Sequence, residues 1–227
     1  MPPFGGQGAF MAQAYTPKQI INKKFNLLPF EGAWKEFVGC PARGFSAIIW
    51  GASSSGKSSL AMQWARYLTQ FGKVAYNSLE EGISHTMQMN LKRNYMDSVE
   101  GKFLLIDNEP IAELLERMEK HKSPDFLIID SVQYMQTDKE EYKKLKRLMK
   151  DKNKGLILIS QANGKEPKGE LADFARYDVD LKIRVEGYKA FPAGRMNGGG
   201  SPFVIYPQKA SEYWGEVKQD DNEYIEL

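Results

Sequence analysis

The chain has 227 residues, with 31 Lys and Arg against 29 Asp and Glu, so its formal net charge is +2 and its isoelectric point is about 8.4. This near balance excludes both a polybasic nucleic-acid-binding tail that dominates the molecule and an acidic disordered chain. Hydrophobic residues make up 42% of the chain and aromatic residues 12%, which is enough for a sizeable core. We therefore expect one globular α/β domain.

The sequence argues against a membrane-embedded or exported protein. Cys40 is the single cysteine, so no intrachain disulfide can form, which fits a reducing compartment. Apolar runs such as 47–50 and 126–129 are far shorter than the roughly 20 residues of a membrane-spanning helix. The amino terminus has no basic residue before Lys18 and no long apolar segment, unlike a secretory signal. We expect a cytoplasmic protein.

From about residue 45, short apolar runs alternate with helical patterns, which is typical of βαβ units around a parallel sheet. After residue 180, short runs punctuated by glycine and proline indicate antiparallel strands, and the glycine-rich run at 194–202 indicates a mobile hairpin tip. In chain order we expect strands at 45–50, 74–76, 103–106, 126–129, 156–160, 181–185, 188–191, 203–206 and 213–217, and helices at 58–71, 83–95, 111–118 and 138–152.

A phosphate-binding motif occupies the first turn from strand to helix. The segment Gly51-Ala-Ser-Ser-Ser-Gly56-Lys57-Ser58 fits G-x-x-x-x-G-K-[ST], in which backbone N–H groups and the start of a helix bind phosphate. Lys57 would neutralise the β- and γ-phosphates and the Ser58 hydroxyl would hold Mg²⁺; the alternative is a serine-rich surface turn. The candidate nucleotide-binding residues are Gly51, Ser53, Ser54, Ser55, Gly56, Lys57, Ser58 and Ser59.

Three further polar positions follow expected strands. Asp130 ends an apolar strand and is a candidate Mg²⁺ ligand, although many strands end in Asp. Glu80 and Glu81 end the second strand, where one could activate water near a γ-phosphate and the other could begin the next helix. Gln161 follows a core strand and could sense the γ-phosphate, or simply cap the strand end.

Together these elements resemble the RecA-like ATPases, in particular the RadA and DnaB helicase-core branch. Ser78-Leu79-Glu80 is similar to the family's Ser-Leu-Glu, Asp130-Ser-Val-Gln-Tyr-Met to its Asp-x-x-Gln-x-Met, and Ser160-Gln161 to its strand-end Ser-Gln. The segment 172–187 is similar to the one that follows the family's second DNA-binding loop. The likeness spans about residues 30–206, and its specificity comes from the order and spacing of the motifs.

The resemblance implies ATP and Mg²⁺ as ligands, with catalytic roles for Lys57, Glu80, Gln161 and Arg195, and metal binding by Ser58 and Asp130. It also implies a homo-oligomer, a hexameric ring or a filament, with ATP between subunits and a Lys-x-Arg element that reaches the neighbouring site. Arg195 matches the arginine, but Ala193 stands at the lysine position, where Lys189 could substitute. Arg195 could also be an ordinary surface residue of a hairpin.

By the same resemblance, two loops at 136–141 and 163–173 would face DNA, more readily single-stranded, with Lys139, Lys165 and Lys168 as contacts. Neither loop has the mixture of aromatic and basic residues typical of a strong single-strand-binding surface. The basic helix at 139–154 could contact phosphates too, or be an ordinary solvated helix face.

We expect an arm at 1–29, a RecA-like ATPase domain at 30–218 and an acidic tail at 219–227, which leaves no room within this chain for an accessory primase-binding or zinc domain. The leading hypothesis is an ATP-hydrolysing motor acting on DNA in replication, recombination or repair. The alternatives are a KaiC-like ATP-gated switch or loader with a protein partner and slow, DNA-independent turnover, and a small-molecule kinase, against which the absence of an arginine-rich lid counts.

Overall fold

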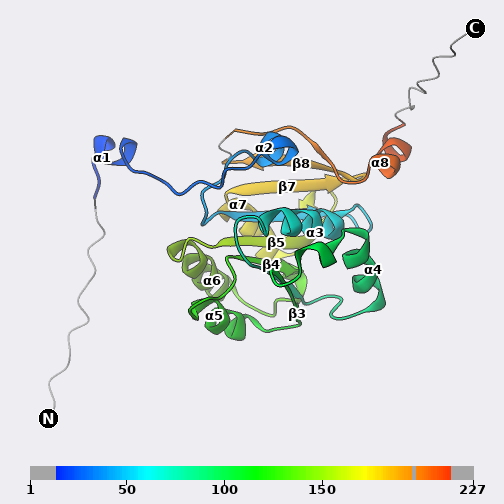
Figure 1. Ribbon diagram of the computed structural model, residues 1–227, viewed down its shortest axis with the longest axis horizontal. Helices are drawn as coiled ribbons and strands as arrows, with labels where there is room; N and C mark the ends of the chain where they lie inside the picture. The colour runs from blue at the N-terminus through cyan, green and yellow to red at the C-terminus, as the bar shows by residue number, and fades with distance from the viewer. Residues whose placement is uncertain (1–13, 196–197, 216–227) are drawn as a thin grey trace, which may run out of the picture.

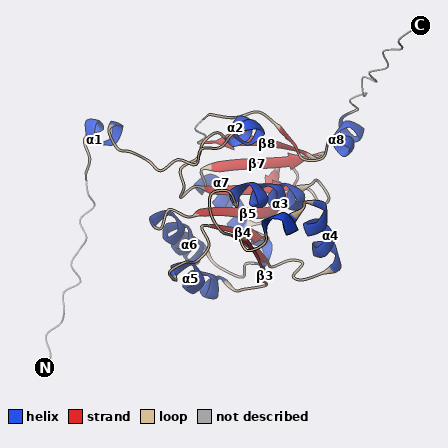
Figure 2. Cartoon of the chain, in the orientation of Figure 1, coloured by secondary structure: helices blue, strands red, loops and turns tan. Residues whose placement is uncertain are grey.

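The computed structural model describes residues 14–195 and 198–215, and its centre is a single sheet with helices on both faces (Figures 1 and 2). The order of the strands across the sheet is β3-β2-β4-β5-β1-β7-β8-β9, and β6 pairs with β5 outside this path. The strands are β1 (Ser46–Gly51), β2 (Val74–Ser78), β3 (Phe103–Asp107), β4 (Phe126–Asp130), β5 (Gly155–Asn163), β6 (Glu166–Pro167), β7 (Leu181–Glu186), β8 (Lys189–Gly194) and β9 (Phe203–Val204).

Helices connect most of these strands, and the expected helices are all present within a few residues of their predicted ends. The helices are α1 (Pro17–Ile21), α2 (Gly32–Val38), α3 (Lys57–Leu68), α4 (His85–Arg93), α5 (Ile111–Glu119), α6 (Lys139–Asp151), α7 (Glu170–Asp178) and α8 (Pro207–Trp214), with 3-10 turns η1 (Met96–Val99) and η2 (Val132–Tyr134). No helix in the described part of the chain is long and apolar enough to cross a membrane.

Strands β3, β2, β4, β5, β1 and β7 are parallel, whereas β8 and β9 extend the sheet in antiparallel pairs. The expected fold class, a mostly parallel sheet with antiparallel C-terminal strands, is confirmed. Because parallel strands end at one edge, the residues after β1, β2, β4 and β5 meet there. That edge therefore receives the phosphate loop and the polar residues singled out from the sequence.

Two apolar cores separate the layers. On one face, buried residues of α3 such as Leu60 and Trp64 pack with Ile49 and Phe126 of the sheet, and α2 and α4 join this core. On the other face, buried residues of α5, α6 and α7 pack on the alternate strand positions, such as Ile48 and Leu127. The central strands are buried on both faces, which explains why their sequences are continuous apolar runs rather than alternating ones.

One expected strand is wrong. Residues 213–214, predicted to begin a strand at 213–217, lie at the end of helix α8. Pro207 occupies the first turn of α8, where its fixed φ suits a helix and its missing N–H costs nothing, and Gly215 ends the helix with a φ of 68°. Residues 216–217 lie outside the described residues.

The glycine-rich run at 194–202 is anchored where the structure describes it, contrary to the expected mobile tip. The backbone N–H groups of Gly200 and Ser201 donate to the carbonyls of Phe37 and Glu36 in α2, both at 3.0 Å. A Cβ on Gly199 would lie 2.5 Å from the backbone nitrogen of Gly39, so this contact requires glycine. Residues 196–197 of this run lie outside the described residues.

The amino-terminal segment leaves the body of the protein before the core begins. Helix α1 stands apart from the sheet (Figure 1) and buries none of its residues. Leu28 and Phe30 are buried in the core beside α3, so the chain joins the domain at about the boundary expected at residue 30. Residues 1–13 of the expected arm and all of the expected acidic tail lie outside the described residues.

Candidate nucleotide-binding site

The phosphate loop links β1 to α3, and close packing dictates its glycines. Gly51 ends β1, and a Cβ there would lie 2.2 Å from the carbonyl oxygen of Val185 in β7. Gly56 precedes α3 with a φ of 107°, a conformation that other residues rarely adopt. These two positions let the backbone between them curl at the start of a helix, which is the arrangement that binds phosphate groups.

Lys57 is the first residue of α3, and its ammonium folds back over the loop. Its Nζ donates to the carbonyl oxygen of Ala52 at 2.7 Å. Burial lowers the pKa of Lys57, while the carboxylates of Asp130 and Glu80 oppose that shift. The positive charge is therefore partly desolvated and lies between the loop and two acids, where the electrostatic attraction for an anionic ligand is greater than at an open surface.

Asp130 ends β4 and is buried beside Tyr76 of β2. The Tyr76 hydroxyl donates to Oδ2 of Asp130. Burial raises the pKa of Asp130 to about 6, with a further increase from the charge of Glu80, although the Tyr76 hydrogen bond and Lys57 act in the opposite direction. A buried carboxylate with a raised pKa gains stability from any cation that binds next to it.

The two glutamates after β2 have different partners. Glu80 accepts hydrogen bonds from the Ser131 hydroxyl at 2.9 Å and from Nε2 of Gln161 at 3.2 Å. Glu81 accepts from the hydroxyls of Ser84, at 3.0 Å, and Thr86, at the start of α4. Glu80 is thus held among the ends of β4 and β5, whereas Glu81 supports the next helix.

Gln161 lies near the end of β5, and Gln133 fixes its backbone. The Gln133 side chain accepts from the backbone N–H of Gln161 at 3.0 Å and donates to the Ser160 hydroxyl at 2.9 Å. Because successive residues of a strand face opposite sides, Ser160 faces α7 while Gln161 faces the phosphate loop. The Gln161 amide is therefore directed at Glu80 from a rigid backbone.

These groups surround one cavity of about 610 Å³ at the carboxyl edge of the sheet. Its volume lies in the range of small-molecule ligand sites. The lining residues are Ser53, Ser54, Lys57, Ser58, Glu80, Glu81, Asp130, Ser131, Gln161, Ala162 and Lys168. Of the other predicted nucleotide-binding residues, Gly51 and Ser55 line an adjoining cavity of about 230 Å³, and Gly56 and Ser59 lie at the start of α3.

The oxygen donors in this cavity fit a magnesium ion. Ser58 and Asp130 both line the cavity and would supply a hydroxyl and a carboxylate. Mg²⁺ is usually bound by one or two carboxylates together with phosphate oxygens and water, rather than by a cage made of protein alone. The residues predicted as metal ligands are therefore brought together on the same side of the phosphate loop.

Arg195 lies at the opposite edge of the sheet. Strand β8 is antiparallel to β7, so Gly194 pairs with Leu181 at the beginning of β7, whereas Gly51 of the phosphate loop lies beside Val185 near the end of β7. Arg195 donates its backbone N–H to Asp180, and its side chain is exposed. The structure thus does not bring Arg195 to the phosphate loop of its own chain.

Lys189 does not stand near Arg195 either. It begins β8 opposite Glu186, at the phosphate-loop edge, and its ammonium lies over the Trp214 ring. The residue opposite Ala193 is Lys182, whose ammonium lies over the Tyr177 ring. Tyr177 lines a cavity of about 250 Å³ together with Arg195.

The three predicted nucleic-acid contacts are in different environments. Lys139 forms an ion pair with Glu170 at 2.5 Å, and Lys165 is exposed and lines the adjoining cavity. Lys168 lines the phosphate-loop cavity itself. The structure therefore does not gather the three lysines on one surface.

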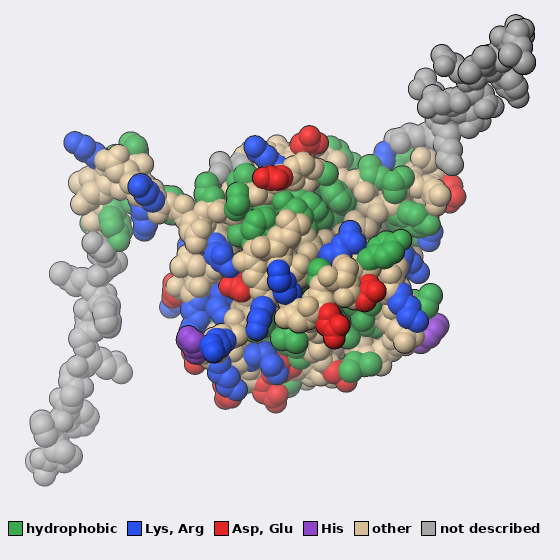
Figure 3. Space-filling view, in the orientation of Figure 1, with side chains coloured by type: hydrophobic (Ala, Val, Ile, Leu, Met, Phe, Trp, Pro, Cys, Tyr) green, Lys and Arg blue, Asp and Glu red, His purple; other side chains and the backbone are tan. Residues whose placement is uncertain are grey.

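Lys and Arg side chains do gather at the lower left of Figure 3, toward the end of the molecule at which α5 and α6 lie. Helix α6 carries much of this charge, but acids offset it. Lys143 pairs with Glu140 at 2.8 Å, and Lys146 pairs with Asp178 at 2.8 Å. The buried residues of α6 are Tyr142, Leu145 and Met149, in agreement with the expected apolar face.

Two residues of the site were not assigned from the sequence. Tyr76 reaches Asp130 because β2 pairs with β4 in the register Ser78 to Asp130, which only the folded sheet defines. Ser131 follows the predicted metal ligand directly and holds Glu80. A hydroxyl next to a strand-end acid could have suggested Ser131, whereas nothing in the sequence distinguishes Tyr76 from a core tyrosine.

Comparisons with known proteins agree with this geometry. No family model matches the chain. The DNA repair protein RadA of Streptococcus pneumoniae (strain ATCC BAA-255 / R6) is 33% identical over 90 residues, which are 40% of this chain and 20% of RadA. The chain thus matches about a fifth of the length of that relative.

Among solved structures, the ATPase domain of a helicase superposes with a TM-score of 0.53 at 15% identity, covering 74% of this chain and 84% of that domain. At this identity the superposition speaks for the fold. The chain has the RecA-like P-loop fold, in the branch that includes the DnaB and RadA proteins.

Proposed function

We propose that this protein binds and hydrolyses ATP with Mg²⁺ as a RecA-like motor acting on DNA. The observation that carries the proposal is the convergence of Lys57, Ser58, Glu80, Asp130 and Gln161 on one cavity at the phosphate loop. These residues come from the ends of four strands or the turns that follow them, so only the folded sheet brings them together. Their chemistry comprises the phosphate-binding, metal-binding and base functions that phosphoryl transfer to water requires.

In the proposed mechanism, backbone N–H groups of the phosphate loop and the Lys57 ammonium bind the β- and γ-phosphates. Bound at Ser58 and Asp130, Mg²⁺ would neutralise phosphate charge. Glu80 orients a water molecule and accepts its proton as the water oxygen attacks the γ-phosphorus and the bond to ADP breaks. Ser131 and Gln161 hold the Glu80 carboxylate in position for this step.

Gln161 is the proposed sensor of the γ-phosphate. Its Nε2 donates to Glu80, and a γ-phosphate in the cavity would offer that amide a second, more highly charged acceptor. An exchange of acceptor would alter the position of the segment after β5, which carries Lys165 and Lys168. This is the route by which hydrolysis would reach the proposed DNA-facing loops.

The proposed assembly is a homo-oligomer with ATP at subunit interfaces, in which Arg195 of one subunit reaches the site of the next. Its support is the placement of Arg195, exposed and at the edge opposite the phosphate loop, so that a neighbour rather than its own site is within reach. Lys182, which lies opposite Ala193, takes the place proposed for the missing lysine. A protein that acts on DNA is supported by the match to a DNA repair protein.

The test of the catalytic assignment is ATP hydrolysis by Glu80→Gln. We expect this variant to bind ATP but to lose about 100-fold or more in turnover, because the amide cannot accept the proton. Glu81→Gln is the matched comparison and keeps most of the turnover, since Glu81 bonds to Ser84 and Thr86. Equal turnover in wild type and Glu80→Gln would remove Glu80 from this role.

The test of the motor is an ATPase titration with single- and double-stranded DNA, together with mass measurement with and without ATP. We expect hydrolysis to rise with single-stranded DNA and the mass to correspond to a ring or filament. A monomer with DNA-independent hydrolysis would contradict the proposal.

One observation favours a second candidate function, an ATP-gated switch or loader that turns over slowly on a protein partner. The acids that pair with Lys139, Lys143 and Lys146 reduce the positive charge available for DNA on α6. An ATPase rate indifferent to DNA but raised by a protein partner would favour this candidate.

A further inference from the structure

The segment that follows β5 is a tight hairpin that folds back over the end of its own strand. Ala162 pairs with Pro167 and Asn163 with Glu166, and Gly164 turns the chain with a φ of 61°. The backbone N–H of Lys168 then donates to the carbonyl of Gln161 at 2.8 Å. Lys168 is therefore returned to the strand end from which the hairpin left.

Gln133 fixes Lys168 and Gln161 together. Its Nε2 donates to the carbonyl of Lys168 at 2.5 Å, while its Oε1 accepts from the backbone N–H of Gln161 at 3.0 Å. One side chain from η2 thus ties the backbone of Lys168 to the γ-phosphate-sensing position. The two residues have to move together or not at all.

The Lys168 side chain lines the phosphate-loop cavity, with Lys57 and Ser58 on the other side of it. Among the described residues no ion pair of Lys168 is seen, whereas Lys139 is paired with Glu170. The same cavity contains Glu80 and Asp130, so a second cation offsets acids that would otherwise repel a nucleotide. Lys57 comes from the helix side and Lys168 from the β5 side, next to Gln161.

We propose that Lys168 is a ligand of the terminal phosphate of the bound nucleotide rather than a nucleic-acid contact, and that it makes the site prefer a nucleoside triphosphate to a diphosphate. The proposal rests on the proposed nucleotide binding at this cavity. Because the hairpin places Lys168 beside Gln161 and Glu80, its ammonium meets the end of the phosphate chain that the water attacks. A charge-assisted bond there forms with the triphosphate and is lost with the diphosphate.

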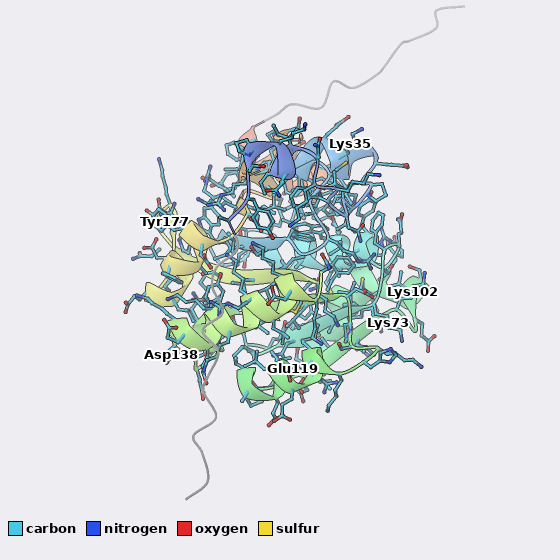
Figure 4. The ribbon with its side chains drawn as sticks, turned by 90° about the vertical axis from the view of Figure 1, so that its left-hand side faces the viewer. Lys35, Lys73, Lys102, Glu119, Asp138 and Tyr177 are labelled. Carbon is cyan, nitrogen blue, oxygen red and sulfur yellow. The ribbon has the colours of Figure 1, made fainter. Side chains whose placement is uncertain are left out.

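The test measures the binding of adenylyl-imidodiphosphate, a non-hydrolysable ATP analogue, and of ADP by calorimetry in the presence of Mg²⁺. The variants are Lys168→Ala and Lys168→Arg, with Lys102→Ala as the control. Lys102 is exposed at the start of β3, at the edge where the strands begin, and Figure 4 shows it close to Lys73. Binding of single-stranded DNA is measured in parallel by fluorescence anisotropy.

We expect Lys168→Ala to bind the ATP analogue about tenfold more weakly, with ADP binding within twofold of wild type and DNA binding unchanged. Lys168→Arg retains most of the preference for the analogue because it keeps the positive charge, and Lys102→Ala behaves like wild type. Lys168 is exposed in a hairpin, so its truncation leaves the core packing intact.

Three results would overturn the proposal while leaving the proposed function in place: unchanged analogue binding by Lys168→Ala, an equal loss for the analogue and ADP, or a loss of DNA binding with nucleotide binding unchanged. The last result would return Lys168 to the nucleic-acid surface. Failure of wild type to bind either nucleotide would overturn both the proposed function and this inference.

Discussion

Neighbouring residues at the carboxyl edge of the sheet have unlike surroundings. Asp130 is buried and accepts a hydrogen bond from Tyr76, while Glu80 accepts bonds from Ser131 and Gln161. Burial raises the pKa of Asp130 to about 6, so a charge is held where the protein alone solvates it poorly. This cost to the unliganded protein is a direct reason for a cation to bind there.

We expect Asp130→Asn to raise the free energy of unfolding by about 2 kcal/mol at pH 8, measured by urea denaturation in EDTA without nucleotide. The folded-state pKa of about 6 lies above the ordinary value of 3.8, so the ionised carboxylate destabilises the fold fully above pH 6. The cost declines as the pH falls and is absent below about pH 4, where the folded and unfolded states both hold the proton.

The advantage of Asp130→Asn should therefore vanish at low pH. Asp107→Asn, at the exposed end of β3, is the control and should change the stability by less than about 0.5 kcal/mol. A stability gain that persists unchanged at pH 4 would show that Asp130 does not titrate as described.

At the scale of elements, helix α6 has a structural task that its sequence does not reveal. Its apolar face is buried against the sheet and α5, and Lys146 bonds to the backbone and the carboxylate of Asp178 at the end of α7. In Figure 4 the labelled Asp138, just before α6, and Tyr177, in α7, lie on the same side of the molecule. The basic residues of α6 therefore partly serve to join two helices.

We expect Lys146→Ala to lower the free energy of unfolding by about 1 kcal/mol, because Asp178 loses a half-buried partner. Single-stranded DNA affinity should stay within twofold of wild type, as measured by fluorescence anisotropy. Lys143→Ala, which loses only the exposed pair with Glu140, is the matched control for stability. A tenfold loss of DNA affinity at unchanged stability would instead make α6 a DNA-binding surface.

At the scale of the whole molecule, the phosphate loop and Arg195 occupy opposite edges of one sheet. The antiparallel turn from β7 to β8 carries the chain away from the phosphate loop and back to the edge where β7 begins. A single subunit consequently has one half of the proposed catalytic arrangement at each edge. Adjacent subunits stacked edge to edge would join the halves.

Mixing two inactive variants tests this arrangement. We expect Glu80→Gln and Arg195→Ala each to hydrolyse ATP at a small fraction of the wild-type rate, and their mixture to recover part of it. Recovery occurs because some interfaces then combine an intact Glu80 with an intact Arg195. The measurement is the ATPase rate at constant total protein, and a rate equal to the average of the two variants would argue against action between subunits.

The elements that the sequence predicted well are those with strong local periodicity. Strands β1, β4 and β5 are continuous apolar runs, and α3 and α6 carry apolar residues at helical spacing. Helix α8 was missed because its eight residues bury only Ala210, which leaves a weak pattern, and because its end is set by the local conformation of Gly215. Short elements with little buried surface give periodicity little to detect.

The sequence by itself determined the phosphate loop and the strand-end positions of Glu80, Asp130 and Gln161, since these depend on a local motif and on apolar runs that end in polar residues. Tertiary structure alone decided which glutamate turns to Gln161, that Tyr76 reaches Asp130, that Lys168 lines the cavity and that Arg195 lies at the far edge. These facts depend on strand order, register and hairpin geometry. Each arises from pairing between residues far apart in the chain, which no local pattern encodes.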